Sequence, residues 1–405
     1  MSEYLPGLEG VPATQSNISD LDGIKGILTY RGYRIVDLAL NSTFEETSLL
    51  LLDGHLPTYE KLEEFDQQLR SNRIVKYNVR EIMKYLPATG HPMEMLQTAV
   101  ASLGMFYQGD ECLTGSNMCG DLNYVHNMSV KLIARMATIV AMWEHVRNGY
   151  DPYAPRKDLN YAENLLYMFS GEDPDPFMAR IMDASLILHA EHTINASTFA
   201  ALVAGSTLAS PFLVIAAAIG TLAGPLHGGA NQRVVDMLEE IGRPGNVKSW
   251  LDKKLANKAK IWGMGHREYK VKDPRATILQ RLMHELMEHR GGNMGPMFET
   301  ALALEEACEE KLAPKGVYAN VDFYSGILYK EMGIPPDQFT SIFAIARSAG
   351  WLAHWREQLG DNRIFRPTQV YAGQSERDYV PISERKPVRY YPDKLHPESQ
   401  VGLHR

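Results

Sequence analysis

Gly224-Pro225-Leu226-His227-Gly228-Gly229-Ala230-Asn231 sets a single imidazole among three glycines, and Pro225 stiffens the approach to it. This stretch closes a run, residues 192–232, that contains no Asp, Glu, Lys or Arg. Glycine allows another group to come close to the main chain, and a lone polar side chain in an apolar turn suits a small-molecule pocket. A tight turn with an incidental histidine explains this segment, taken alone, equally well.

The uncharged run also indicates the fold class. Residues 199–226 are long and apolar enough to suggest a membrane span. However, Gly205, Ser206, Ser210-Pro211 and Gly220 divide the run, and no basic flank follows it. Two buried helices broken near Ser210-Pro211 are therefore the better interpretation. Strands do not alternate with helices elsewhere in the pattern, so we predict a mostly helical fold rather than a doubly wound sheet.

Helix start and stop signals on both sides of the run support this prediction. Thr43 precedes a predicted helix over residues 44–53 that stops at Gly54, and Asp273-Pro274 opens another. Apolar periodicity predicts further helices over residues 59–70, 93–105, 128–146, 161–169, 179–188 and 296–312.

Three other local signals make predictions. Leu21-Asp22-Gly23-Ile24 is a hairpin signal before residues 27–30. Asn231 is expected to cap the helix that follows the glycine turn, and Thr340 to open the last long helix.

Composition restricts the class of protein. The chain has 405 residues, 45% of them apolar, and its net charge of −8 argues against nucleic acid as the main partner. Cys112, Cys119 and Cys308 form no C-x-x-C pair, so neither a disulfide framework nor a thiolate zinc site is indicated. Residues 1–6 lack the basic stretch followed by an apolar stretch that marks a secretory signal peptide. We expect a cytoplasmic protein with no membrane partner.

His189-Ala190-Glu191-His192 places two imidazoles three residues apart on one helix face. This spacing departs from the zinc motif H-E-x-x-H, and no third ligand is near, so we expect no metal there. The alternative is that one histidine contacts a ligand while the other is a satisfied core residue.

Gly263-Met264-Gly265-His266-Arg267 is a second glycine-flanked histidine, and Lys270, Lys272 and Arg275 follow it. Glycines with free amides and nearby cations suit a phosphate-bearing ligand, although a solvated basic loop is the commoner use of such a run. Arg275 lies in the first turn of a predicted helix, where the macrodipole disfavours a cation. An anionic ligand would explain it.

Asn320-Val321-Asp322-Phe323-Tyr324-Ser325-Gly326 places one carboxylate in an apolar and aromatic setting. Asp322 is either a helix N-cap or a partly desolvated carboxylate whose raised basicity suits proton abstraction. Arg347 lies on an otherwise apolar helix, and Arg366 lies in a short apolar segment. Such arginines pair either with carboxylates of the protein or with a substrate that carries several carboxylates.

Together these stretches resemble the citrate synthase family, in its shorter prokaryotic form, from about Tyr30 to Arg366. The signatures, in chain order, are His192 with Asn195-Ala196-Ser197-Thr198-Phe199, the glycine turn around His227, Gly263 to Arg275, and Asn320-Val321-Asp322. The resemblance implies condensation of oxaloacetate with acetyl-CoA, a co-substrate, followed by thioester hydrolysis. No cofactor is permanently bound, and no metal is needed.

The resemblance also implies a role for each residue. Asp322 would remove a methyl proton from acetyl-CoA, His227 would stabilise the enol, and His266 would polarise the oxaloacetate ketone. The substrate carboxylates would be held by His192, Arg275 and Arg347, with Arg366 reaching into the neighbouring subunit's site of a homodimer.

The family's fold is all-α, with a large domain and a smaller mobile one. Here residues 1–228 and 337–405 would form the large domain and residues 229–336 the small domain, hinged near the glycine turn. Adenine would be bordered by Trp262, Gly263, Met264 and Gly265, and Lys270 would meet a phosphate. The tail residues Arg377, Arg385 and Lys386 could contribute or could be a solvated face.

Three alternatives stay open. The 2-methylcitrate synthases share these motifs and take propionyl-CoA, and one methylene gives only about 1–3 kcal/mol of discrimination. A CoA- or anion-binding protein without catalysis is the second alternative, and the presence of Asp322 weighs against it. A metallohydrolase built on His189 and His192 is a distant third.

Overall fold

The computed structural model describes residues 4–107, 116–292, 295–373 and 376–385. Residues 13–365 form one compact unit. A second unit comprises the terminal segments, residues 1–12 and 366–405, and the regular elements in its described part are the short helices η1 (Pro6–Leu8) and η7 (Ile382–Glu384). The other helices and strands of the described residues belong to the larger unit.

The larger unit begins with a small antiparallel sheet. Strand β1 (Ser19–Asp22) pairs with β2 (Ile27–Tyr30), with Ser19 opposite Tyr30, and β2 pairs with β3 (Tyr33–Arg34). The predicted hairpin is therefore confirmed. The side chains of Ser19 and Tyr30 reach Glu191, next to His192.

The all-α prediction is confirmed, since the other regular elements of the described chain are helices. The first group comprises α1 (Ile35–Asn41), α2 (Phe44–Asp53), α3 (Tyr59–Asn72), α4 (Tyr77–Lys84), α5 (Pro92–Leu103), η2 (Gly104–Phe106), α6 (Ser116–Gly120), α7 (Leu122–Arg147), α8 (Tyr161–Ser170) and α9 (Pro176–His189). The second comprises α10 (Ala196–Ser206), α11 (Pro211–Leu222), α12 (Ala230–Ile241), η4 (Pro244–Asn246), α13 (Val247–Ala256), α14 (Pro274–His289), α15 (Pro296–Leu312), η5 (Ala313–Lys315), α16 (Val321–Glu331), η6 (Pro336–Gln338) and α17 (Phe339–Leu359).

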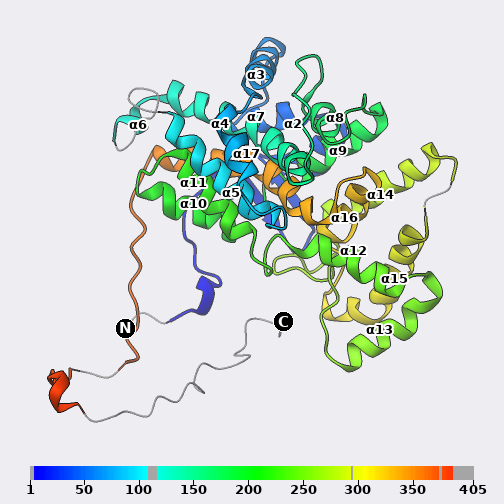
Figure 1. Ribbon diagram of the computed structural model, residues 1–405. Helices are drawn as coiled ribbons and strands as arrows, with labels where there is room; N and C mark the ends of the chain where they lie inside the picture. Colours follow the sequence, from blue (N-terminus) through cyan, green and yellow to red (C-terminus); the bar gives the residue numbers. More distant parts are fainter. Residues whose placement is uncertain (1–3, 108–115, 293–294, 374–375, 386–405) are drawn as a thin grey trace. The chain divides into compact units, whose positions relative to one another are not determined.

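The uncharged run forms two helices, α10 and α11, which are interrupted at Ser210 as predicted. They pack against each other and against α17, which is buried along most of its length and also contacts α2, α7 and α9 (Figure 1). Within the described residues, no helix combines the length and apolarity that crossing a membrane requires.

Cap residues decide where several helices begin. The side chains of Thr43, Thr58 and Asp273 each accept a backbone N–H of the helix they precede, as predicted for Thr43 and Asp273. Two cap predictions are wrong. Helix α12 starts two residues earlier than expected, with Gly229 as its N-cap and Asn231 buried inside it, and α17 is preceded by η6 rather than opened by Thr340.

Helices α12 to α16 lie close together at one side of the larger unit (Figure 1). Among them, α16 packs against α12 and α14, and α15 packs against α12 and α13. This group falls within residues 229–336, the range predicted for the small domain. The boundaries and mobility of that domain stay a prediction.

Candidate active site

The glycine turn positions His227 directly after α11. The N–H of Gly228 donates to the Leu222 carbonyl (3.0 Å), and the N–H of His227 donates to the Gly224 carbonyl (2.9 Å). A Cβ on Gly228 would lie 2.5 Å from the Leu222 oxygen, so glycine is needed here for close approach. The Thr340 hydroxyl donates to the Gly228 carbonyl (3.1 Å), which ties the turn to α17.

Hydrogen bonds fix the protonation of His227. The backbone N–H of Ser197, in the first turn of α10, donates to Nε2 (3.3 Å), so Nε2 must carry a lone pair and the proton lies on Nδ1. The Ser197 hydroxyl, 2.9 Å from Nε2, is itself held by Trp351 Nε1 (3.2 Å). Burial, aided by the charge of Arg347, lowers the pKa of His227 to about 4. His227 is thus a neutral Nδ1–H donor at neutral pH.

The second glycine-flanked histidine lies beside the segment that carries Asp322. Residues 263–265 join residues 318–320 through three hydrogen bonds, namely Gly265 N–H to the Tyr318 carbonyl (2.7 Å), Asn320 N–H to the Gly263 carbonyl (2.9 Å) and Asn320 Nδ2 to the Gly265 carbonyl (2.8 Å). Gly263 has a φ of +75°, and a Cβ there would lie 2.9 Å from Phe323 Cα. His266 and Asp322 are therefore presented by neighbouring backbones.

His266 is also a neutral imidazole with a defined tautomer. The backbone N–H groups of Glu268 (3.1 Å) and Tyr269 (3.3 Å) donate to Nδ1, which places the proton on Nε2. Burial, followed by the charge of Arg275, lowers the pKa of His266 to about 4. Its Nε2–H has no partner within the part of the chain that the structure describes, so it can donate to a ligand oxygen.

Asp322 lies in the first turn of α16, and the helix N-cap is Asn320, whose side chain accepts the Asp322 N–H (3.0 Å). The N-cap interpretation of Asp322 is therefore wrong. Its Oδ1 is buried and has no hydrogen-bond partner among the described residues. Burial raises the pKa of Asp322 to about 6, against the opposing charges of Arg275 and Arg347. A carboxylate in this setting is more basic than usual.

His192 lies next to His266, with 5.1 Å between the ring centroids, and its Nε2 is 3.3 Å from Tyr269 Oη. Burial lowers the pKa of His192, and the positive charges of Arg275 and Arg347 act in the same direction. The structure thus brings His192, His266 and these two arginines into one electrostatic environment. An anion bound there would offset the positive charges of Arg275 and Arg347.

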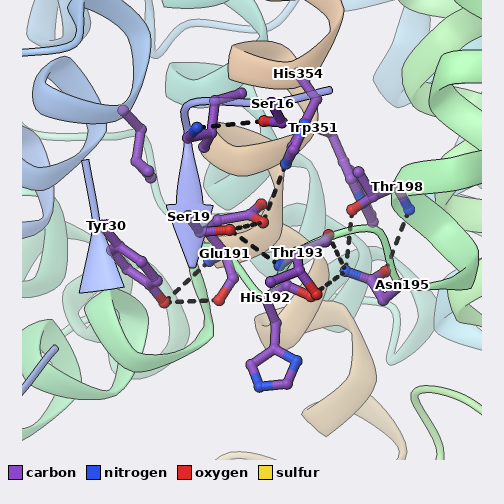
Figure 2. Close-up of polar contacts among 12 residues, drawn as sticks. Ser16, Ser19, Tyr30, Glu191, His192, Thr193, Asn195, Thr198, Trp351 and His354 are labelled. Carbon is purple, nitrogen blue, oxygen red and sulfur yellow. Dashed lines mark hydrogen bonds and ion pairs between the residues drawn. The ribbon is translucent and has the colours of Figure 1, made fainter. Parts of the chain in front are cut away.

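A buried network behind His192 was missed by the sequence analysis. Figure 2 shows the His192 ring directed away from this network, which centres on Glu191. Glu191 Oε1 accepts the Ser19 hydroxyl (3.0 Å) and lies 3.1 Å from His354 Nε2, while the Tyr30 hydroxyl donates to the Glu191 carbonyl (2.8 Å). Ser19 also accepts the Thr193 N–H (3.2 Å). Strands β1 and β2 and helix α17 thereby fix the turn that carries His192.

Replacing Glu191 by glutamine should destabilise the protein by about 3 kcal/mol, because it removes one partner of a buried pair. Burial opposes ionisation of Glu191, but His354 and Arg347 hold its pKa below the ordinary value, so the carboxylate is charged at neutral pH. Urea unfolding at pH 7 measures the loss. Glu285→Gln is the matched control, because Glu285 pairs with Arg281 on the surface, where such a pair contributes under about 1 kcal/mol. Equal losses in the two variants would contradict the role given to Glu191.

The arginines divide into two kinds. Arg275 makes a two-pronged ion pair with Asp273 (2.7 and 3.0 Å), and both side chains are buried, so the interpretation as a protein salt bridge holds for Arg275. Arg347 is also buried, but its Nε donates to the His189 carbonyl (2.8 Å) and no carboxylate of the described chain forms an ion pair with it. Arg347 is thus a buried cation whose charge is not neutralised by a paired carboxylate of the described chain, as expected for a residue that binds an anionic ligand.

The remaining predicted residues lie at the periphery or elsewhere. Trp262 is half-buried, with Lys260 Nζ 4.2 Å and Arg233 Cζ 4.9 Å from its ring centroid. Lys270 is exposed, and its Nζ donates to the Arg267 carbonyl (3.0 Å), as in a solvated loop. Arg366 belongs to the terminal unit, where its Nη1 donates to the Pro367 carbonyl, and Lys386 lies outside the described residues.

The two histidines of His189-Ala190-Glu191-His192 have separate surroundings. His189 is fully buried, and its Nδ1–H donates to the Ser185 carbonyl (2.7 Å). In the part of the chain that the structure describes, no group of three or more His, Cys, Asp or Glu side chains could hold a metal ion. Cys119 and Cys308 are free thiols, and Cys112 lies outside the described residues. The metallohydrolase alternative therefore lacks a ligand set here.

Comparison with known proteins places this geometry in context. The family model described as "Citrate synthase, C-terminal domain" matches residues 7–368. Citrate synthase from Acidithiobacillus ferridurans is 60% identical over 382 residues, covering 94% of this chain and 98% of that protein. Citrate synthase from Synechocystis is 52% identical, with 94% of each chain covered.

Solved structures give the same result. The crystal structure of citrate synthase from Pyrobaculum aerophilum superposes with a TM-score of 0.86 at 41% identity, covering 94% of this chain and 95% of that one. A ternary complex of the Thermoplasma acidophilum citrate synthase with carboxymethyl coenzyme A and oxaloacetate gives a TM-score of 0.88 at 32% identity, covering 95% and 100%.

Proposed function

This chain belongs to the citrate synthase family and is an acyltransferase that converts an acyl group into an alkyl group on transfer, and we propose that it condenses acetyl-CoA with oxaloacetate. The condensation would be followed by hydrolysis of citryl-CoA to citrate and CoA. The carrying observation is Asp322, whose buried Oδ1 has no hydrogen-bond partner among the described residues and whose backbone lies next to that of His266. His266 and His227 are both neutral imidazoles with a defined N–H donor.

The proposed chemistry assigns each donor and acceptor one task. A thioester methyl proton is very weakly acidic, so a base and a stabiliser of the developing oxyanion must act together. Asp322 removes the proton, and the Nδ1–H of His227 donates to the thioester oxygen as the enol forms. The Nε2–H of His266 polarises the oxaloacetate ketone and is transferred to it as the new carbon–carbon bond forms.

Binding of oxaloacetate is proposed to use His192, Arg275 and Arg347. Arg347 supports this proposal most directly, because a buried guanidinium that has no carboxylate partner within the described residues favours an anionic ligand. Arg275 is already paired with Asp273, so its contribution is a further hydrogen bond from a guanidinium held in fixed orientation.

Binding of acetyl-CoA is proposed to use Trp262, Gly263, Met264 and Gly265 for the adenine and Lys270 for a phosphate. The Thermoplasma enzyme was solved with a CoA analogue and oxaloacetate together, which supports a ternary complex for this chain as well. We also propose a cytoplasmic homodimer in which Arg366 contributes to the neighbouring subunit's site, and closure of residues 229–336 over the substrates.

Mixing the protein with oxaloacetate and acetyl-CoA should release free thiol, and kcat/KM for acetyl-CoA should exceed that for propionyl-CoA by about tenfold or more, since a pocket shaped for one methyl resists an extra methylene. A chromogenic thiol reagent follows both reactions side by side, with oxaloacetate omitted as the control. Preference for propionyl-CoA would favour 2-methylcitrate synthesis. Binding of CoA without thiol release from either substrate would favour the non-catalytic alternative.

A further inference from the structure

Tyr329 lies on the same helix as the proposed base. It follows Asp322 by seven residues in α16, which brings the two side chains to nearly the same helix face. Long side chains on a helix point back toward its N-terminus, where Asp322 lies. Tyr329 is fully buried. The negative charge of Asp322 adds to burial in raising the pKa of the Tyr329 phenol, as expected for neighbouring groups.

Three buried polar atoms, two on this helix and one on His189, whose ring lies beside Tyr329, have no hydrogen-bond partner among the described residues. They are Oδ1 of Asp322, Oη of Tyr329 and Nε2 of His189. The rings of His189 and Tyr329 have centroids 6.3 Å apart. Because the Nδ1–H of His189 donates to the Ser185 carbonyl, its Nε2 can only accept. Of the three groups, only the Tyr329 hydroxyl has a proton to donate.

The charged groups around Asp322 do not provide a hydrogen-bond donor to its carboxylate. Arg275 and Asp273 face it from the start of α14, Arg347 from α17, and Lys260 from the segment before Trp262. None of the three cations lies within ion-pair distance of the Asp322 carboxylate. They act on it through space, and a short-range donor is still required for a buried carboxylate to ionise.

We propose that Tyr329 is a positioning residue for Asp322, acting through one buried water molecule that accepts from the Tyr329 hydroxyl and donates to Asp322 Oδ1 and His189 Nε2. A direct bond between the two oxygens is absent, and both belong to one helix, so motion between elements does not bring them together. One water with one acceptor and two donor contacts satisfies all three orphaned atoms, and buried waters typically make about three hydrogen bonds.

The consequence concerns the base, so this inference rests on the proposed function. A donor stabilises the ionised carboxylate and therefore lowers its pKa relative to a site without the donor. The hydroxyl thus counteracts the burial that raises the Asp322 pKa. It also fixes Oδ1, which leaves Oδ2 as the oxygen that meets the substrate.

The test is the pH dependence of kcat for Tyr329→Phe, which removes the hydroxyl and keeps the ring. The acidic limb should move to higher pH by about one unit, the size expected for a hydrogen bond to a charged group. The KM for oxaloacetate should change less than about twofold, since the phenol is not among the groups proposed to bind the oxaloacetate carboxylates, His192, Arg275 and Arg347. Superposition of the variant and wild-type limbs would overturn the proposal.

A second replacement keeps the test independent of folding. Site-specific 3-fluorotyrosine at position 329 retains the hydroxyl and makes it a stronger donor, so the limb should move to lower pH. A merely structural residue gives no such opposite pair of shifts, and shifts of the same sign would contradict the proposal.

The matched control is Tyr324→Phe. Tyr324 is buried on the same helix, and its hydroxyl donates to Glu305 rather than facing Asp322. This variant should lose thermal stability and keep the wild-type limb. If the wild-type protein releases no thiol from any acyl-CoA, the proposed function fails. If the wild type is active and the acidic limb of its pH profile coincides with that of all three variants, only the role of Tyr329 fails.

Discussion

Asp322→Asn should lower the rate of thiol release by about 10²–10⁴-fold, the range contributed by a positioned general base. Asparagine has nearly the same shape as aspartate but cannot take the methyl proton. Oxaloacetate affinity should stay measurable, because Arg347 and His192 are unchanged by the substitution. Single-substrate binding by calorimetry and steady-state kinetics with acetyl-CoA separate the two effects.

The matched control for this variant is Asp252→Asn. Asp252 is a surface carboxylate paired with Lys311, so its amide should leave the rate unchanged. The pH profile provides a second check. A general base works only when ionised, and the pKa of Asp322 is about 6, so wild-type activity should fall as the pH drops through that value. Full activity in Asp322→Asn would show that another group is the base.

His227→Ala should lower kcat by about 10²–10³-fold, as loss of one donor to a developing oxyanion does. The expected effect depends on the tautomer. Ser197 donates to Nε2, so the proton proposed to stabilise the enol is on Nδ1, and alanine removes that donor. The KM for oxaloacetate should change little, because the variant keeps His266, the proposed donor to the ketone, and the two buried arginines, Arg275 and Arg347.

The comparison for His227→Ala is His289→Ala, which removes an exposed histidine that lies near Asp175. That variant should retain wild-type kcat. The thermal stability of His227→Ala should be measured as well. If the variant is partly unfolded at the assay temperature, and this unfolding explains the whole loss of kcat, the role proposed here is contradicted. A glutamine at position 227 that restores part of the rate would support it, since the amide offers an N–H donor.

Local signals in the sequence predicted much of this fold because they act over a few residues. Thr43 and Asp273 cap their helices through contacts two or three positions away, and Ser210-Pro211 interrupts the apolar run through backbone sterics. The position of Asn231 was predicted wrongly. Gly229 allowed the helix to begin earlier, and the asparagine side chain became buried.

The site itself could be predicted only in part. The glycine-flanked histidines and Asp322 were found because each lies within a short motif. Glu191 was missed because its partners, Ser19 and His354, lie far away along the chain. The pairing of Arg275 with Asp273 is a local contact that the sequence left open, since a substrate anion explained the arginine equally well. No spacing rule encodes the tautomers of the histidines, which depend on backbone amides brought in by folding.

The hydrogen bonds between residues 263–265 and 318–320 have a consequence for how the enzyme would avoid wasting its co-substrate. If residues 229–336 swing as one body, the ketone polariser and the proton acceptor travel together and keep their mutual spacing at every stage. The imidazole of residue 227 stays behind with α10 and α17. Under the proposed roles, a partly open enzyme would be unable to generate the carbon nucleophile, and the thioester would survive until the second substrate has arrived.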